Sequence, residues 1–75
     1  MKPHLAKRSF SLAGHRTSIA LEPEFWAALE DAAQERGIGL SALVVELDAA
    51  RAEGAAPLAS TLRVFALRRA HGGPG

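Results

Sequence analysis

The chain has 75 residues, no cysteine and a net charge of +1 at pH 7. A chain this short forms one small domain, in the size range where an isolated core is marginal and oligomerisation is a common remedy. The lack of cysteine excludes disulfides and thiolate metal sites, and the sequence has neither a signal-peptide pattern nor a membrane-spanning apolar run. We therefore expect a homodimer in the cytoplasm that binds no membrane.

The charge is unevenly distributed along the chain. Residues 1–20 carry four basic residues and no acid, for a local net charge of +4. Residues 21–54 hold all eight acids against two arginines, for −6, and residues 55–75 add three arginines, for +3. This polarity favours a protein that presents one basic face to a polyanion such as nucleic acid.

The first residues show little periodicity. Residues 1–8 are basic and predict a flexible arm, which either contacts phosphates or is plainly disordered. Residues 9–14 alternate weakly and are interpreted as an irregular or partly extended lead-in, with Phe10 packing on the dimer. The main alternative is an intramolecular hairpin from Ser9 to Leu21. We prefer the lead-in because Ala13-Gly14 is a poor two-residue hairpin turn, whose first position needs a positive φ.

The next stretch alternates strictly and predicts one short strand. Its apolar face holds Thr17, Ile19 and Leu21, and its polar face holds Arg16, Ser18 and Ala20. A single strand cannot satisfy its own backbone groups, so we expect an identical strand from a second copy, antiparallel across a two-fold axis. Such an intermolecular ribbon fits a major groove of DNA, where Arg16 and Ser18 would face base edges.

Three helices are predicted after the strand. The first begins at Pro23 and is ended by Gly37, since proline is favoured at the first helical position and glycine just past the last turn. The second covers residues 40–52, the third residues 58–70, and residues 71–75 form a disordered tail. The fold class is therefore mainly α with one short strand, in a domain over residues 9–70. The expected dimer core consists of Ile19, Leu21, Trp26, Leu29, Leu43, Val44 and Leu47.

This order of elements resembles the ribbon-helix-helix family of dimeric DNA-binding proteins. The motifs that carry the resemblance are Arg16-x-Ser18-Ile19-Ala20-Leu21, Pro23-Glu24-Phe25-Trp26 and Gly37-Ile38-Gly39-Leu40-Ser41. More narrowly, the chain looks like a small bacterial subgroup with an added third helix. The motifs for that subgroup are Lys7-Arg8-Ser9, Gly14-His15-Arg16-Thr17-Ser18 and Leu62-Arg63-Val64-Phe65.

The resemblance implies a role for each matching position. Base contacts are implied for Arg16, Ser18 and Ala20, and a phosphate contact is implied for Gly39, Leu40 and Ser41. Free N–H groups and the helix dipole at the start of a helix favour an anion there. We expect Lys7 and Arg8 to meet only phosphates. The implied function is a homodimeric, sequence-specific DNA-binding protein of the nucleoid, a transcriptional regulator such as a repressor, with room for dimer–dimer contacts on DNA.

Other functions have less support in the sequence. The three histidines lack metal-ligand spacing and no catalytic motif is present, so we expect no metal, no cofactor and no enzyme activity. An alternative is a protein-interaction module, such as an antitoxin or adaptor, although residues 71–75 are too few to wrap a partner. Another is a dimer that binds an anionic ligand on Arg63, Arg68 and Arg69, which we rank below a third helix with solvated arginines.

Overall fold

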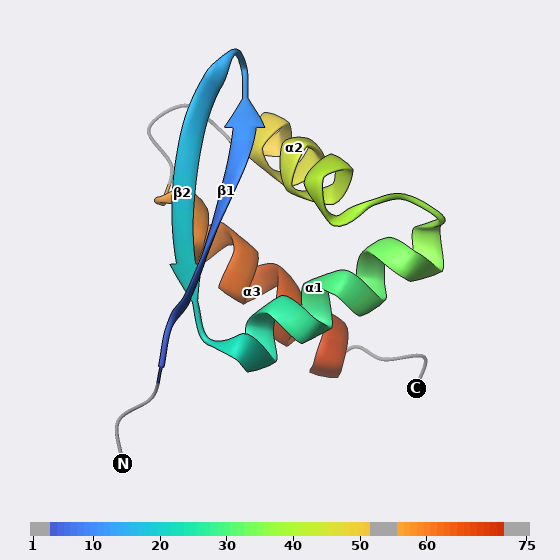
Figure 1. Ribbon diagram of the computed structural model, residues 1–75. Helices are drawn as coiled ribbons and strands as arrows, with labels where there is room; N and C mark the ends of the chain where they lie inside the picture. Colours follow the sequence, from blue (N-terminus) through green and yellow to red (C-terminus); the bar gives the residue numbers. More distant parts are fainter. Residues whose placement is uncertain (1–3, 52–55, 72–75) are drawn as a thin grey trace.

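The computed structural model describes residues 4–51 and 56–71, which form a two-stranded antiparallel sheet followed by three helices (Figure 1). The elements in chain order are β1 (Ala6–Leu12), β2 (His15–Leu21), α1 (Pro23–Arg36), α2 (Leu40–Ala50) and α3 (Leu58–His71). The two strands form a hairpin, and the helices lie to one side of it. None of the helices in the described part of the chain is long and apolar enough to cross a membrane.

Both strands belong to one chain, and this corrects the expected fold class. The register pairs Ala6 with Leu21 and Leu12 with His15, so β2 is paired along its whole length by its own chain. The prediction of a single strand completed by a second copy is therefore wrong. The irregular lead-in over residues 9–14 is also wrong, because β1 covers most of it, and the alternative hairpin is observed instead.

The hairpin forms in spite of its turn. Ala13 and Gly14 both adopt left-handed conformations, with φ of 51° and 83°, and the alanine costs about 1–2 kcal/mol there. The inner face of β1 offsets this cost by burying Phe10 and Leu12, since each fully buried large apolar side chain contributes about 1.5–3 kcal/mol. Trp26 adds a hydrogen bond, because its indole N–H donates to the Ala6 carbonyl at 2.7 Å. Tertiary burial thus overrides the local turn preference.

The three helices confirm the sequence prediction to within two residues. α1 begins at Pro23, and Gly37 ends it with a φ of 71°. The Ile38 N–H donates to the Ala33 carbonyl at 3.0 Å, which is the hydrogen bond expected of a Schellman-type stop. α2 ends two residues before the predicted end, and α3 extends one residue further, to His71.

The core lies between the inner face of the hairpin and the helices. Six of the seven residues predicted as the dimer core are buried within one chain: Ile19, Leu21, Trp26, Leu29, Leu43 and Val44. Their burial needs no second chain. Leu47, the seventh, is half-buried at the surface between α2 and α3.

The structure describes the predicted arm and the predicted tail only in part. β1 begins at Ala6, so Lys7 and Arg8, which were expected in the flexible arm, lie in a strand. Residues 1–3 of the predicted arm and 72–75 of the predicted tail lie outside the described residues.

Candidate nucleic-acid interface

Pairing of the two strands creates a polar surface on the outer side of the hairpin. Because residues that face each other across a ladder share a side, one set of alternate positions points away from the core. We call this set the polar hairpin face; it consists of Lys7, Ser9, Ser11, Arg16, Ser18 and Ala20. All are exposed except Ala20, which is half-buried. The face carries two cations and no acid.

Hydrogen bonds link the side chains of this face across the strands. The hydroxyls of Ser9 and Ser18 lie 3.0 Å apart, and Arg16 Nη1 donates to the Ser11 hydroxyl at 3.3 Å. Both contacts are exposed, so they can be exchanged for a ligand at little cost. Lysine and arginine only donate, whereas serine both donates and accepts. The face can therefore bond to phosphate oxygens and to the mixed donors and acceptors of base edges.

Arg8 lies on the opposite side of the hairpin from Lys7. Its guanidinium lies 5.1 Å from the centre of the Trp26 ring, and its Nη1 is 2.7 Å from the Glu30 carboxylate. Arg8 was expected, like Lys7, to contact phosphate, but the alternation of β1 places the two side chains on opposite sides. In one chain the charge of Arg8 is already paired and does not join the polar hairpin face.

The start of α2 offers free backbone donors at a second place. Gly39 is the N-cap without a side-chain cap, and the first hydrogen bond there runs from the Leu43 N–H to the Gly39 carbonyl, at 3.1 Å. The N–H groups of Leu40, Ser41 and Ala42 thus precede the helical hydrogen bonds. This end lies at the turn between α1 and α2, across the domain from the hairpin (Figure 1). One chain therefore does not bring the two predicted contact sites together.

Ser9 and Ser11 belong to the polar hairpin face but were not among the predicted site residues. They lie opposite Ser18 and Arg16 in the register. The signal that indicated them was the alternation of polar residues at 7, 9 and 11, which matches the alternation at 16, 18 and 20. Reading both stretches as paired strands would have placed all six on one side.

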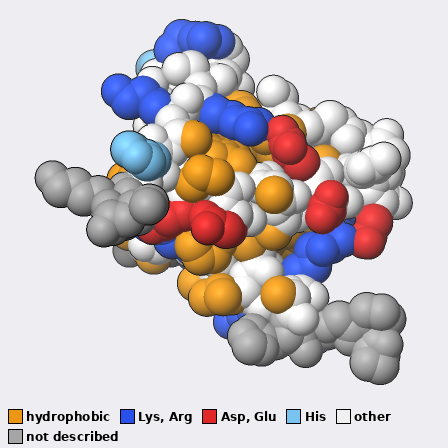
Figure 2. Space-filling view, turned by 60° about the horizontal axis from the view of Figure 1, so that its bottom comes forward, with side chains coloured by type: hydrophobic (Ala, Val, Ile, Leu, Met, Phe, Trp, Pro, Cys, Tyr) orange, Lys and Arg blue, Asp and Glu red, His pale blue; other side chains and the backbone are white. Residues whose placement is uncertain are grey.

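Away from the hairpin face, most arginines are paired with carboxylates. The ion pairs among the described residues are Arg8–Glu30, Arg36–Glu46, Arg51–Asp48, Arg63–Glu22 and Arg69–Glu35. Arg16 and Arg68 have no carboxylate partner within the described ranges. Figure 2 shows basic side chains gathered at the top of the face in view, with acidic side chains below them. Uncompensated positive charge is thus concentrated on the hairpin and at one position of α3.

Glu22 lies between β2 and α1 and has a perturbed acidity. A backbone hydrogen bond within the residue is the largest cause that lowers the pKa of its carboxyl, and the Arg63 guanidinium, at 3.1 Å, lowers it further. Partial desolvation acts in the opposite direction but is outweighed. Glu22 is therefore a carboxylate held ionised at the junction of the hairpin and the helices, and it joins α3 to that junction.

Comparison with known proteins identifies the family. A family model described as a ribbon-helix-helix domain matches residues 5–70, which confirms the family expected from the sequence. No curated protein and no solved structure matches the chain. The narrower bacterial subgroup stays a prediction. Because the match covers both strands and nearly all of the three helices, the chain belongs to the ribbon-helix-helix family, whose members typically bind DNA as dimers.

Proposed function

We propose that the protein is a homodimeric, sequence-specific DNA-binding protein that regulates transcription, and not an enzyme. The observation that carries the proposal is the polar hairpin face, which presents Lys7 and Arg16 among serines with no acid. A two-stranded ribbon is narrow enough to enter the major groove, which is about 12 Å wide. The typical activity of the family supports the same function.

Individual residues of the face have distinct proposed roles. Arg16 has no carboxylate partner among the described residues and can bond bidentately to guanine. Ser18 can donate to or accept from a base, and Ala20 can contact a thymine methyl group. Lys7, opposite Ala20 near the open end of the hairpin, is suited to a phosphate. Sequence readout therefore depends mainly on Arg16 and Ser18.

The proposed dimer differs from the one expected from the sequence. Because each chain completes its own hairpin, we propose that each subunit brings one complete ribbon to one half-site of DNA. Such a protein acts in the cytoplasm, on the nucleoid. The phosphate contact of Gly39, Leu40 and Ser41 stays part of the proposal. These residues at the start of α2 contact the DNA backbone at a separate place.

Binding to selected and to random DNA tests the proposal. Duplexes are first selected by the protein from a random pool, and affinities for selected and random duplexes of equal length are then measured across a salt series. We expect tighter binding to the selected duplex at every salt concentration. We also expect the slope of log affinity against log salt to report the counterions released on binding. Equal affinity for both duplexes would contradict a sequence-specific regulator, and no salt-dependent binding to either would contradict DNA binding altogether.

A further inference from the structure

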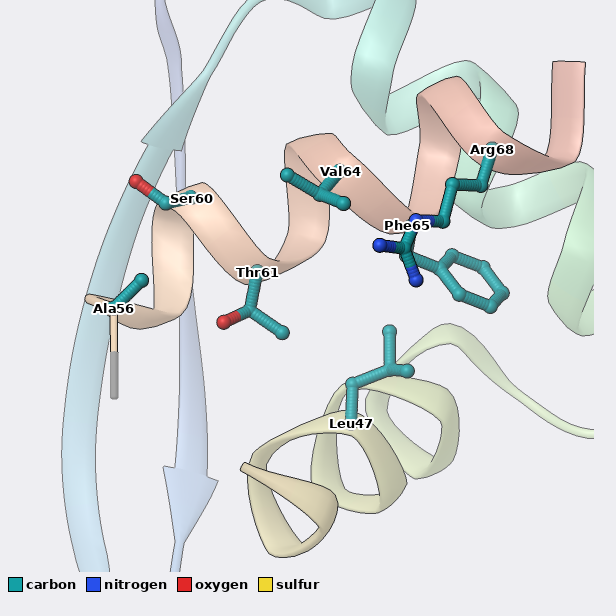
Figure 3. A pocket seen from close by; sticks show the side chains of 7 residues that line it. All are labelled: Leu47, Ala56, Ser60, Thr61, Val64, Phe65 and Arg68. Atoms are coloured by element: carbon teal, nitrogen blue, oxygen red, sulfur yellow. The ribbon is translucent and has the colours of Figure 1, made fainter. Parts of the chain in front are cut away.

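A shallow apolar groove separates α2 from α3 on the surface of the helices. Its volume is about 370 Å³, and Figure 3 shows the side chains that line it. Leu47 from α2 and Val64 and Phe65 from α3 provide most of the apolar wall, and Thr61 lies between them and the hairpin end of α3. Val64 keeps 45% of its surface exposed. The hydrocarbon of this groove is therefore open to a ligand.

One end of the groove carries an uncompensated positive charge. In Figure 3 the Arg68 side chain folds back from α3, so that its guanidinium lies beside Phe65 and faces the space above Leu47. Its neighbours differ: Arg36 is 2.8 Å from the Glu46 carboxylate, and Arg69 pairs with Glu35. No carboxylate in the described part of the chain pairs with Arg68.

The hollow continues past Arg68 between two arginines that are paired with glutamates. A second cavity shares Phe65 and Arg68 with the groove and adds Arg36, Arg69 and Glu35. Arg36 and Arg69 are paired there with Glu46 and Glu35, so Arg68 keeps the uncompensated charge at this end, while the rest of the groove is mostly apolar. A ligand that matches both ends has a hydrocarbon body and a negatively charged head.

We propose that this groove binds a small amphipathic carboxylate, with its hydrocarbon body on Leu47 and Val64 and its carboxylate on Arg68. Guanidinium and carboxylate form charge-assisted, often bidentate hydrogen bonds. The volume lies at the lower end of the range of small-molecule sites, roughly 300–1,000 Å³. From Ser60 to Arg68, the residues of α3 that line the groove, the helix advances only about 12 Å, which suits a small molecule better than a partner helix. The site uses no residue of the polar hairpin face and does not rest on the proposed function.

Titration of the full chain with three related probes tests the site. Decanoate has a hydrocarbon body and a carboxylate head, decanol has the same hydrocarbon body without the charge, and acetate has the carboxylate without the long hydrocarbon body. Each probe is used at concentrations at which it does not aggregate. Backbone amide NMR shifts and calorimetry follow binding. We expect decanoate to shift the amides of Leu47, Thr61, Val64, Phe65 and Arg68. Decanol should bind roughly tenfold or more weakly and acetate should not bind, since a hydrogen bond to a charged group is lost in one case and apolar burial in the other.

Two pairs of variants separate the contact with the ligand's carboxylate from the contact with its hydrocarbon body. Arg68→Gln should weaken decanoate binding roughly tenfold or more, whereas Arg16→Gln, which also removes an arginine without a described carboxylate partner, should leave it unchanged. Val64→Glu should abolish binding by placing a like charge in the groove. Its control is Leu67→Glu, because Leu67 is a similarly exposed residue of α3, at 48%, that lines neither cavity.

Four results would overturn the proposal. Equal binding of decanoate and decanol, or full binding by Arg68→Gln, would remove the role of the charge. Equal loss in Val64→Glu and Leu67→Glu would indicate a broad apolar face, as a partner helix needs. The fourth result is a wild-type dimer that fails to bind decanoate, while sedimentation shows that Val64→Glu converts this dimer to a monomer. That result would show that a second copy of the chain fills the groove.

Discussion

The polar hairpin face and the surface of the helices differ in how their arginines are paired. On the helices, Arg36, Arg63 and Arg69 each pair with a glutamate, and Arg68 is the exception among the described residues. On the hairpin face, Arg16 bonds only to a serine hydroxyl, and no acid lies beside it. The net charge of +1 hides this difference. A binding surface for a polyanion is therefore indicated by charges that lack partners, and not by their number.

The two regions are joined through Trp26, and its removal should have the largest effect. Its ring lies 5.8 Å from the Phe10 ring, and its indole N–H bonds to the Ala6 carbonyl. Trp26→Ala should lower the free energy of unfolding by about 3–5 kcal/mol and detach β1 first. Trp26→Phe, which keeps a ring but loses the hydrogen bond, should cost less. Urea unfolding and hydrogen exchange of residues 6–12 check this; amides of β1 that stay protected in Trp26→Ala would contradict it.

Arg16→Ala should produce the next largest effect, on sequence preference. Each bidentate arginine–guanine contact contributes about 1–3 kcal/mol of discrimination, and a dimer loses two. Because Arg16 is exposed and points away from the core, stability should change by less than about 0.5 kcal/mol. Affinity for selected and random duplexes, together with the melting temperature, gives both numbers. A folded variant that keeps its full sequence preference would show that another surface of the protein reads the DNA sequence.

Gly39→Asp tests the start of α2 as a second contact with DNA. A Cβ at this position meets no atom within 4 Å, and aspartate is a good N-cap, so stability should hold or rise slightly. The new negative charge should weaken binding to selected and random DNA alike, because it repels phosphates. Gly39→Asn, a cap of similar shape without the charge, is the control. Unchanged DNA affinity in Gly39→Asp would mean that this end does not meet the backbone.

Lys7 and Arg8 are adjacent in sequence, but we expect different effects from them. Lys7→Ala should reduce the slope of log affinity against log salt by about one per subunit, without altering preference. Arg8→Ala should leave that slope nearly unchanged, because Arg8 lies on the other side of β1 against Trp26 and Glu30. Salt titrations of DNA binding by both variants measure this difference in slope. Equal reductions in slope would show that Arg8 leaves Glu30 for DNA.

The sequence predicted the elements better than their pairing. Proline at 23 and glycine at 37 marked α1 because helix ends follow local rules, and the two faces of β2 followed from its alternation. β1 was missed because its turn places Ala13 in a costly conformation, and the compensation comes from tertiary contacts, namely the burial of Phe10 and Leu12 and the hydrogen bond from Trp26. The groove beside Arg68 depends on how α2 and α3 pack, which residue spacing does not specify.

The smallest effect should come from Glu22, which links the junction of the two regions to α3. Its carboxyl pKa is lower in the folded protein than its ordinary value of 4.5, so the folded state binds fewer protons than the unfolded chain around that pH. The stabilisation is complete above the ordinary value and is lost as pH falls through the folded pKa. Glu22→Gln should therefore reduce the melting temperature slightly at pH 7 and make its decline between pH 5 and pH 3 shallower than in the wild type. Glu24→Gln, on an exposed neighbour without a described ion pair, is the matched control. Parallel melting curves for Glu22→Gln and wild type across this range would show that folding does not lower the pKa of the Glu22 carboxyl.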